Sequence, residues 1–185
     1  MDPTKRIAML GDENTVAREA AASEIYWEGR LLAEAAVRMW RRNTELAELL
    51  VGTPTVGVAV LPATFERVRA AAGMPRLADV PPDLDAAEFE LHFHHPVQLD
   101  ILTTGPARSN GAIAKFLEKF GEGIQQVEFP TSNVDRATEL IRARMGLQPV
   151  YPATRAGADG TRVNFFLAVA PDGKKVLIEL VEEKK

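Results

Sequence analysis

The stretch that decides the fold is residues 112–130, AIAKFLEKFGEGIQQVEFP. Its first nine residues place apolar side chains at helical spacing, and the Gly-Glu-Gly sequence that follows ends the helix. The remaining residues predict a strand over 124–130, in which successive side chains point to opposite faces. Gln126 and Glu128 therefore lie on one face of this strand, and Val127 and Phe129 lie on the other.

Length and composition limit the classes of protein that the chain can form. With 185 residues, 46% hydrophobic residues and a net charge of −4, it has the makeup of a globular protein. The acidic charge argues against nucleic acid or an anionic membrane as a partner. No apolar run approaches the ~20 residues of a membrane span. The lack of cysteine excludes disulfides and thiolate chemistry. Since its start lacks a signal-peptide core, we expect a cytoplasmic protein.

The N-terminal part of the chain is predicted to be helical after a short lead-in. Residues 1–11 read as irregular, and 16–51 are rich in Ala, Leu, Glu and Arg with few helix breakers. This segment predicts two helices, or one long bent helix, with Asn43 at the break.

The same order of elements occurs twice in the chain. Residues 55–73, TVGVAVLPATFERVRAAAG, and residues 126–146, QVEFPTSNVDRATELIRARMG, each read as a strand, a helix and a closing glycine. Further alternating strands follow each copy. The sequence therefore predicts an α+β protein of two βαβββ modules, with the first one shortened. The expected divisions are a helical extension at 1–52, a first module at 53–104, a linker with a short helix at 105–123, and a second module at 124–185.

The hairpin formed by AEFELHF (87–93) and VQLDILTT (97–104) allows two registers. A two-residue loop would pair Phe93 with Gln98, whereas a three-residue loop would pair His92 with Gln98 and Glu90 with Asp100. Because a slip of one residue exchanges the two faces of a strand, only the three-residue loop separates polar from apolar side chains. We therefore predict the three-residue loop.

These modules resemble the vicinal oxygen chelate, or glyoxalase, superfamily. The runs AKFLEKFGEGI, NVDRATELI and VLIELVEE are most similar to the methylmalonyl-CoA epimerases, and the resemblance covers 97–183 well and 53–96 weakly. It implies two βαβββ modules curved into an open barrel around a divalent metal. It also implies a small-molecule substrate such as an acyl-CoA, and a homodimer.

The resemblance further implies one metal ligand from each of four strands, in the order His, Gln or Glu, His, and Glu. Glu179 matches the last position and Gln98 the second, for which Asp100 is the alternative if the register shifts by two residues. Thr55 and Gln126 stand at the two histidine positions. Hydroxyl and amide oxygens bind transition metals less well than imidazole does.

Strand alternation brings the polar candidates to one inner face. His92 is then a candidate to replace a lost metal ligand. The expected ligand-binding residues are Thr55, Gln98, Asp100 and Gln126. The full set on this face is Glu90, His92, Gln98, Asp100, Gln126, Glu128 and Glu179.

Two kinds of function follow from this face. A bound metal would polarise a carbonyl oxygen while Glu179, Glu128 or Glu90 moves the proton α to that carbonyl, as in an isomerase, epimerase or lyase. Without a metal, the same face predicts a protein that binds and sequesters a ligand. The added N-terminal helices leave a third interpretation, a dimeric structural or regulatory member of the superfamily.

Overall fold

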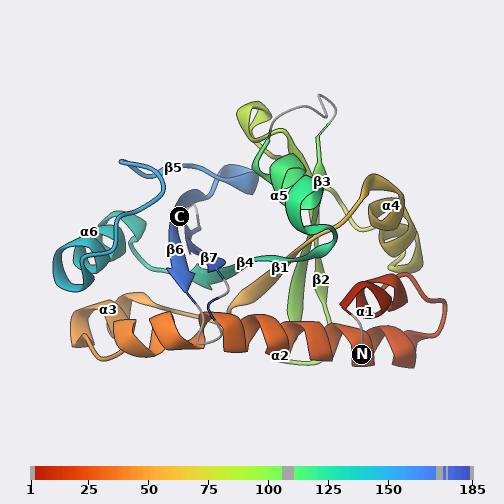
Figure 1. Ribbon diagram of the computed structural model, residues 1–185, viewed down its shortest axis with the longest axis horizontal. Helices are drawn as coiled ribbons and strands as arrows, with labels where there is room; N and C mark the ends of the chain where they lie inside the picture. Colours follow the sequence, from red (N-terminus) through yellow and green to blue (C-terminus); the bar gives the residue numbers. More distant parts are fainter. Residues whose placement is uncertain (1–2, 106–110, 170–172, 174, 184–185) are drawn as a thin grey trace. The chain divides into compact units, whose positions relative to one another are not determined.

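The computed structural model describes residues 3–105, 111–169, 173 and 175–183, and its helices and strands form an α+β fold (Figure 1). The chain divides into two compact units. Unit 1 contains Met1–Glu28 and Thr55–Gln125, and unit 2 contains Gly29–Pro54 and Gln126–Lys185. Each unit holds one of the repeats predicted from the sequence, and the predicted N-terminal extension is shared between the two units.

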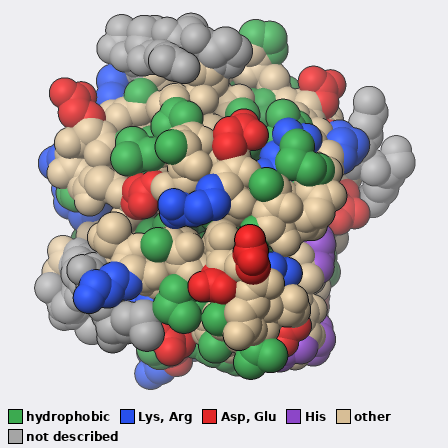
Figure 2. Space-filling view, turned by 90° about the vertical axis from the view of Figure 1, so that its right-hand side faces the viewer, with side chains coloured by type: hydrophobic (Ala, Val, Ile, Leu, Met, Phe, Trp, Pro, Cys, Tyr) green, Lys and Arg blue, Asp and Glu red, His purple; other side chains and the backbone are tan. Residues whose placement is uncertain are grey.

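Unit 1 builds its sheet in the strand order β2-β3-β1. Strand β1 (Thr55–Ala59) runs parallel to β3 (Gln98–Thr104), and β2 (Ala86–His92) runs antiparallel to β3. His92 pairs with Gln98, which confirms the predicted three-residue loop. All histidines of the chain belong to this hairpin, and their side chains are exposed. Histidine is coloured purple at the edge of the surface in Figure 2.

Helices lie on both faces of the unit 1 sheet. On the aliphatic face, α4 (Pro62–Ala71) places the ring of Phe65 4.8 Å from the ring of Phe89. The side chains buried on this face include Val56, Val58, Leu99 and Ile101. On the opposite face, α5 (Ala112–Phe120) packs Ile113 and Leu117 against Ala59 and Leu102. A helix therefore covers the aliphatic face, as predicted, and a second helix covers part of the other face.

Unit 2 forms its sheet in the strand order β4-β7-β6-β5. Strand β4 (Gly123–Pro130) runs parallel to β7 (Lys175–Glu182), while β6 (Arg162–Val169) runs antiparallel to both β7 and the short β5 (Arg155–Ala156). Helix α6 (Val134–Met145) follows β4 and ends at Gly146, which has a φ of 67°. This order is the predicted βαβββ module, and unit 1 has the shorter order β1-α4-β2-β3.

The face of the unit 2 sheet under α6 is aliphatic. Helix α6 packs on β6 and β7, and Phe166, Ile178 and Leu180 on this face are fully buried. Because strand side chains alternate, Glu179 between Ile178 and Leu180 must point to the opposite face. The packing of α6 therefore decides where the polar residues of β7 lie.

The first helix of the chain corrects one prediction. Residues 1–11 were predicted to be irregular, but α1 spans Pro3–Met9. Proline is compatible with the first turn of a helix, and Ile7 is only 2% exposed. A helix this short is marginal by itself and is stabilised by burial. Seven residues also give too little periodicity for the sequence to predict it.

The next two helices follow the sequence pattern. Helix α2 spans Thr15–Trp40, and α3 spans Thr44–Leu49. The side chain of Asn43 caps α3 by accepting a hydrogen bond from the backbone N–H of Leu46 at 2.9 Å. Two helices with a break at Asn43 are thus confirmed. Trp40 at the end of α2 is fully buried in unit 2, with its ring 5.7 Å from that of Phe166.

Some predicted features lie outside the described residues. Residues 106–110 of the predicted linker are among these, and so are residues 170–172 and 174 of the predicted second module. In the ranges that the structure does describe, no helix combines the length and the apolar character that a membrane crossing needs.

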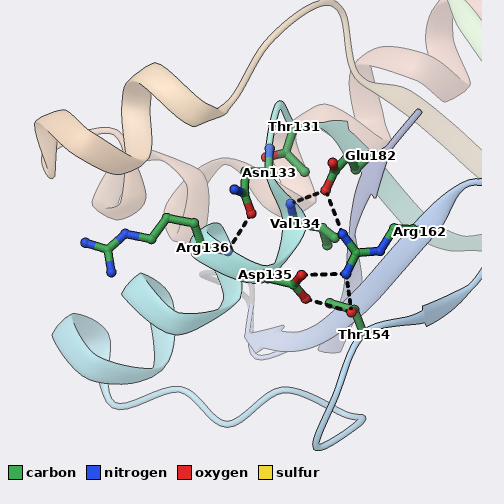
Figure 3. Close-up of polar contacts among 8 residues, drawn as sticks. All are labelled: Thr131, Asn133, Val134, Asp135, Arg136, Thr154, Arg162 and Glu182. Atoms are coloured by element: carbon green, nitrogen blue, oxygen red, sulfur yellow. Dashed lines mark hydrogen bonds and ion pairs between the residues drawn. The ribbon is translucent and has the colours of Figure 1, made fainter. Parts of the chain in front are cut away.

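The N-cap residue of α6 and a side chain from the end of β7 hold the first turn of this helix (Figure 3). Asn133 caps the helix by accepting from the backbone N–H of Arg136 at 2.9 Å. Glu182 at the end of β7 accepts from the backbone N–H of Val134 at 2.8 Å. These contacts satisfy N–H groups that a helix leaves without an internal partner.

An ion pair completes this arrangement. The guanidinium of Arg162 donates to Asp135, and the hydroxyl of Thr154 donates to the same carboxylate at 2.7 Å. Arg162 also lies 3.4 Å from Glu182. The hydrogen bond from Arg162, and after it that from Thr154, lower the pKa of Asp135.

Replacing Asp135 tests this contact. A carboxyl whose pKa is lowered by folding stabilises the protein above its ordinary pKa of about 4, and this stabilisation is lost as the pH falls through the lowered value. Asp135→Asn should reduce the free energy of unfolding by about 0.5–1 kcal/mol at neutral pH, a size typical of exposed ion pairs. Urea unfolding at neutral and acidic pH measures both effects.

The difference between wild type and Asp135→Asn should shrink as the solution is acidified. Glu183→Gln, at an exposed position beyond β7, is the matched control and should have little effect at any pH. A deficit of Asp135→Asn that stays constant across the acidic range would contradict the ion-pair explanation.

Candidate functional site

Three of the predicted site residues form a hydrogen-bonded cluster in unit 2. They lie on the face of the sheet opposite α6, where Glu128 of β4 pairs with Glu179 of β7. The side-chain nitrogen of Gln126 donates to Oε2 of Glu179 at 2.6 Å and lies 3.1 Å from Oε1 of Glu128. We call Gln126, Glu128 and Glu179 the Gln126 cluster.

The Gln126 cluster is largely removed from water. Gln126 is 7% exposed and Glu179 is 8% exposed, while Glu128 is half-buried. An ionised carboxylate only accepts hydrogen bonds, so the network assigns the amide nitrogen of Gln126, not its oxygen, to the side facing both carboxylates. The cluster therefore brings two acidic groups together around one neutral donor.

Apolar side chains share this face with the Gln126 cluster. Phe165 of β6 pairs with Glu179, and Leu167 pairs with Leu177 of β7. Leu167 is 47% exposed, so the apolar area is open to a ligand. The sequence alone does not show which of the adjacent Phe165 and Phe166 points to the core, because either could do so.

The loop before β5 adds an aromatic ring, and β5 itself adds a positive charge. The ring of Tyr151 packs edge-on against Phe165, with 5.9 Å between centroids, and the guanidinium of Arg155 lies 4.7 Å from the Tyr151 ring. Arg155 pairs with Val163, which lies on the same face as Phe165. Sequence reasoning missed Tyr151 and Arg155, because neither a loop nor a strand of two residues has a periodicity that shows where its side chains point.

Unit 1 carries a second polar set on the face of its sheet away from α4. The hydroxyl of Thr55 in β1 lies 3.4 Å from Oε1 of Gln98, to which it can donate. Asp100, two residues further along β3, is 5% exposed. Alternation thus places Thr55, Gln98 and Asp100 on one face of this unit, as predicted.

The remaining two candidates in unit 1 are at the surface. Nε2 of His92 lies 2.9 Å from Oε2 of Glu90, and their side chains are 60% and 62% exposed. Both groups are therefore solvated and in contact with each other.

The residues at the implied metal positions fit a transition metal poorly. In unit 2 Gln126 presents its nitrogen, which cannot bind a metal, to Glu179. In unit 1 Thr55 and Gln98 offer neutral oxygens. Among the described residues, no group of three or more His, Cys, Asp and Glu side chains could hold a metal ion. No chemical step is therefore derived through a metal.

Comparison with known proteins identifies similar solved structures. The methylmalonyl-CoA epimerase of Mycobacterium tuberculosis is 30% identical over 75% of this chain and 91% of that chain, with a TM-score of 0.61. A variant of the Streptomyces coelicolor methylmalonyl-CoA epimerase in complex with 2-nitronate-propionyl-CoA is 28% identical over 74% of this chain and 99% of that chain, with a TM-score of 0.57.

A methylmalonyl-CoA epimerase in complex with methylmalonyl-CoA and NH4+ is also similar. It is 26% identical over 73% of this chain and 94% of that chain, with a TM-score of 0.54. No protein-family model matches the chain, and no curated protein matches it.

The anchoring of the Tyr151 loop can be tested at Asn164, which is fully buried in β6. Its side-chain nitrogen donates to the carbonyl of Tyr151 at 3.2 Å. Asn164→Ala should lower the free energy of unfolding by about 1–3 kcal/mol, because the carbonyl of half-buried Tyr151 loses its donor. Urea unfolding measures the change. Exposed His92→Ala is the control and should change it by less than about 0.5 kcal/mol; equal effects would contradict the anchoring role.

Proposed function

Because the chain belongs to the vicinal oxygen chelate superfamily, we propose that it is an enzyme that moves the proton α to the carbonyl of an acyl thioester. Buried Glu179, held by Gln126 on an open face of unit 2, is the observation that carries the proposal. The similar epimerases solved with acyl-CoA ligands support the choice of substrate class.

Glu179 is assigned the role of general base. A carboxylate oxygen of Glu179 takes the α-proton, the electron pair of the C–H bond passes into an enolate, and return of the proton to the other side of the planar carbon gives the epimer. Gln126 fixes Oε2 of Glu179 at 2.6 Å and so orients the carboxylate. Glu128, held by the same amide, is the second group that can carry the proton.

The side chains around the Gln126 cluster suit an acyl group with an acidic substituent. Phe165, Leu167 and Leu177 offer apolar contacts on the same face. Arg155, stacked on Tyr151, supplies a positive charge for a carboxylate or a phosphate of the ligand. This combination supports binding through one apolar and one anionic part of the substrate.

The experiment is to follow exchange of the α-proton of methylmalonyl-CoA in D2O by NMR. Wild type should catalyse the exchange, and Glu179→Gln should slow it by about 100-fold or more, the usual size of a lost general base. Glu90→Gln is the matched control: it makes the same chemical change at an exposed carboxylate and should leave the rate unchanged.

The hydrogen bonds from Gln126 to both carboxylates favour a second candidate, a protein that binds its ligand without chemistry. Titration calorimetry with the same acyl-CoA separates the two candidates. Binding without exchange in wild type would support the binding protein. Exchange that persists in Glu179→Gln would contradict the assignment of the base.

A further inference from the structure

The Gln126 cluster brings two buried or half-buried carboxylates together, whatever reaction the protein performs. Burying ionised groups is costly unless they are paired or accept hydrogen bonds. Glu179 is 8% exposed, and Glu128 on the neighbouring strand is half-buried. These paired strand positions bring together carboxylate oxygens, which are the ligands that hard divalent cations prefer.

In this chain a side chain lies between the two carboxylates. A primary amide has two N–H hydrogens, and the nitrogen of Gln126 lies 2.6 Å from Glu179 and 3.1 Å from Glu128. Each carboxylate can thus receive one of the two hydrogens. Gln126 is itself 7% exposed, so this donor is held inside the protein and is not free to exchange with solvent.

We propose that the amide of Gln126 takes the place of a bridging cation, so that the cluster is complete without a divalent metal. An ion bridging two carboxylates would lie about 2.0–2.6 Å from an oxygen of each. The amide nitrogen occupies that space, so the ion and the amide cannot both be present in this arrangement. Gln126 is therefore a positioning residue that fixes both acidic groups and keeps cations out.

The proposal concerns the cluster alone and holds whether the protein is an enzyme or a ligand-binding protein. Its test therefore uses cation binding and thermal stability and does not use activity. A negative result in the proton-exchange experiment would not bear on the proposal about the cluster. A negative result in the cation experiment would not bear on the role of Glu179 as base, which the exchange experiment tests.

The sharpest variant is Gln126→Glu, which keeps the size of the side chain and replaces its donor by a third carboxylate. With EDTA present, this variant should melt about 3–8 °C below wild type, because three carboxylates then repel one another. Millimolar Mn2+ should restore the melting temperature. Wild type should show no change in melting temperature when Mn2+ replaces EDTA.

Gln126→Met separates loss of the donor from gain of a charge. It should also melt below wild type, since the buried carboxylates lose a hydrogen bond, but Mn2+ should not restore it. Failure of Mn2+ to rescue Gln126→Glu, or equal rescue of both variants, would overturn the proposal.

A titration of wild type needs no variant that might fail to fold. The untagged protein is titrated with Mn2+, and free Mn2+ is measured by electron paramagnetic resonance. The expected result is no stoichiometric binding. One bound Mn2+ per chain that is lost in Glu179→Gln would overturn the proposal, because Gln126 would then share its site with a cation.

Discussion

The alternation of side chains across the strands is the constraint on which the rest of the molecule depends. In unit 2, Ile178 and Leu180 are buried beneath α6, so Glu179 between them must project from the other face. In unit 1, Phe89 packs against Phe65 of α4, and the same logic places the polar residues of β3 opposite the helix. Each site is therefore a consequence of where the helix packs.

This constraint explains what the sequence could and could not predict. Alternation predicted the hairpin register that pairs His92 with Gln98, because a shift of the strand pairing by one residue would have placed charged side chains on the buried face. It did not reveal α1, which burial stabilises, nor Tyr151, which lies in a loop. It placed Gln126 on the correct face without saying which end of its amide meets Glu179. That orientation depends on neighbours from another strand.

The same constraint separates the fold from the chemistry. Gln126 faces away from the aliphatic core, so the residue type at this position does not affect the packing of Val127 and Phe129 on the opposite face. A structure similar to the methylmalonyl-CoA epimerases therefore does not by itself determine the donor atoms that this face presents. The fold is informative about where a ligand binds, and the donor set is informative about the chemistry that binding allows.

The sharing of α2 between the two units affects how the protein is made. The helix leaves the ribosome early, yet Trp40 at its end packs on Phe166, near the far end of the chain. Its large apolar ring must remain without this partner until β6 has been synthesised, and an exposed ring of this kind is a target for chaperones and for aggregation. For the same reason, neither repeat is expected to fold from a gene fragment that lacks its part of α2.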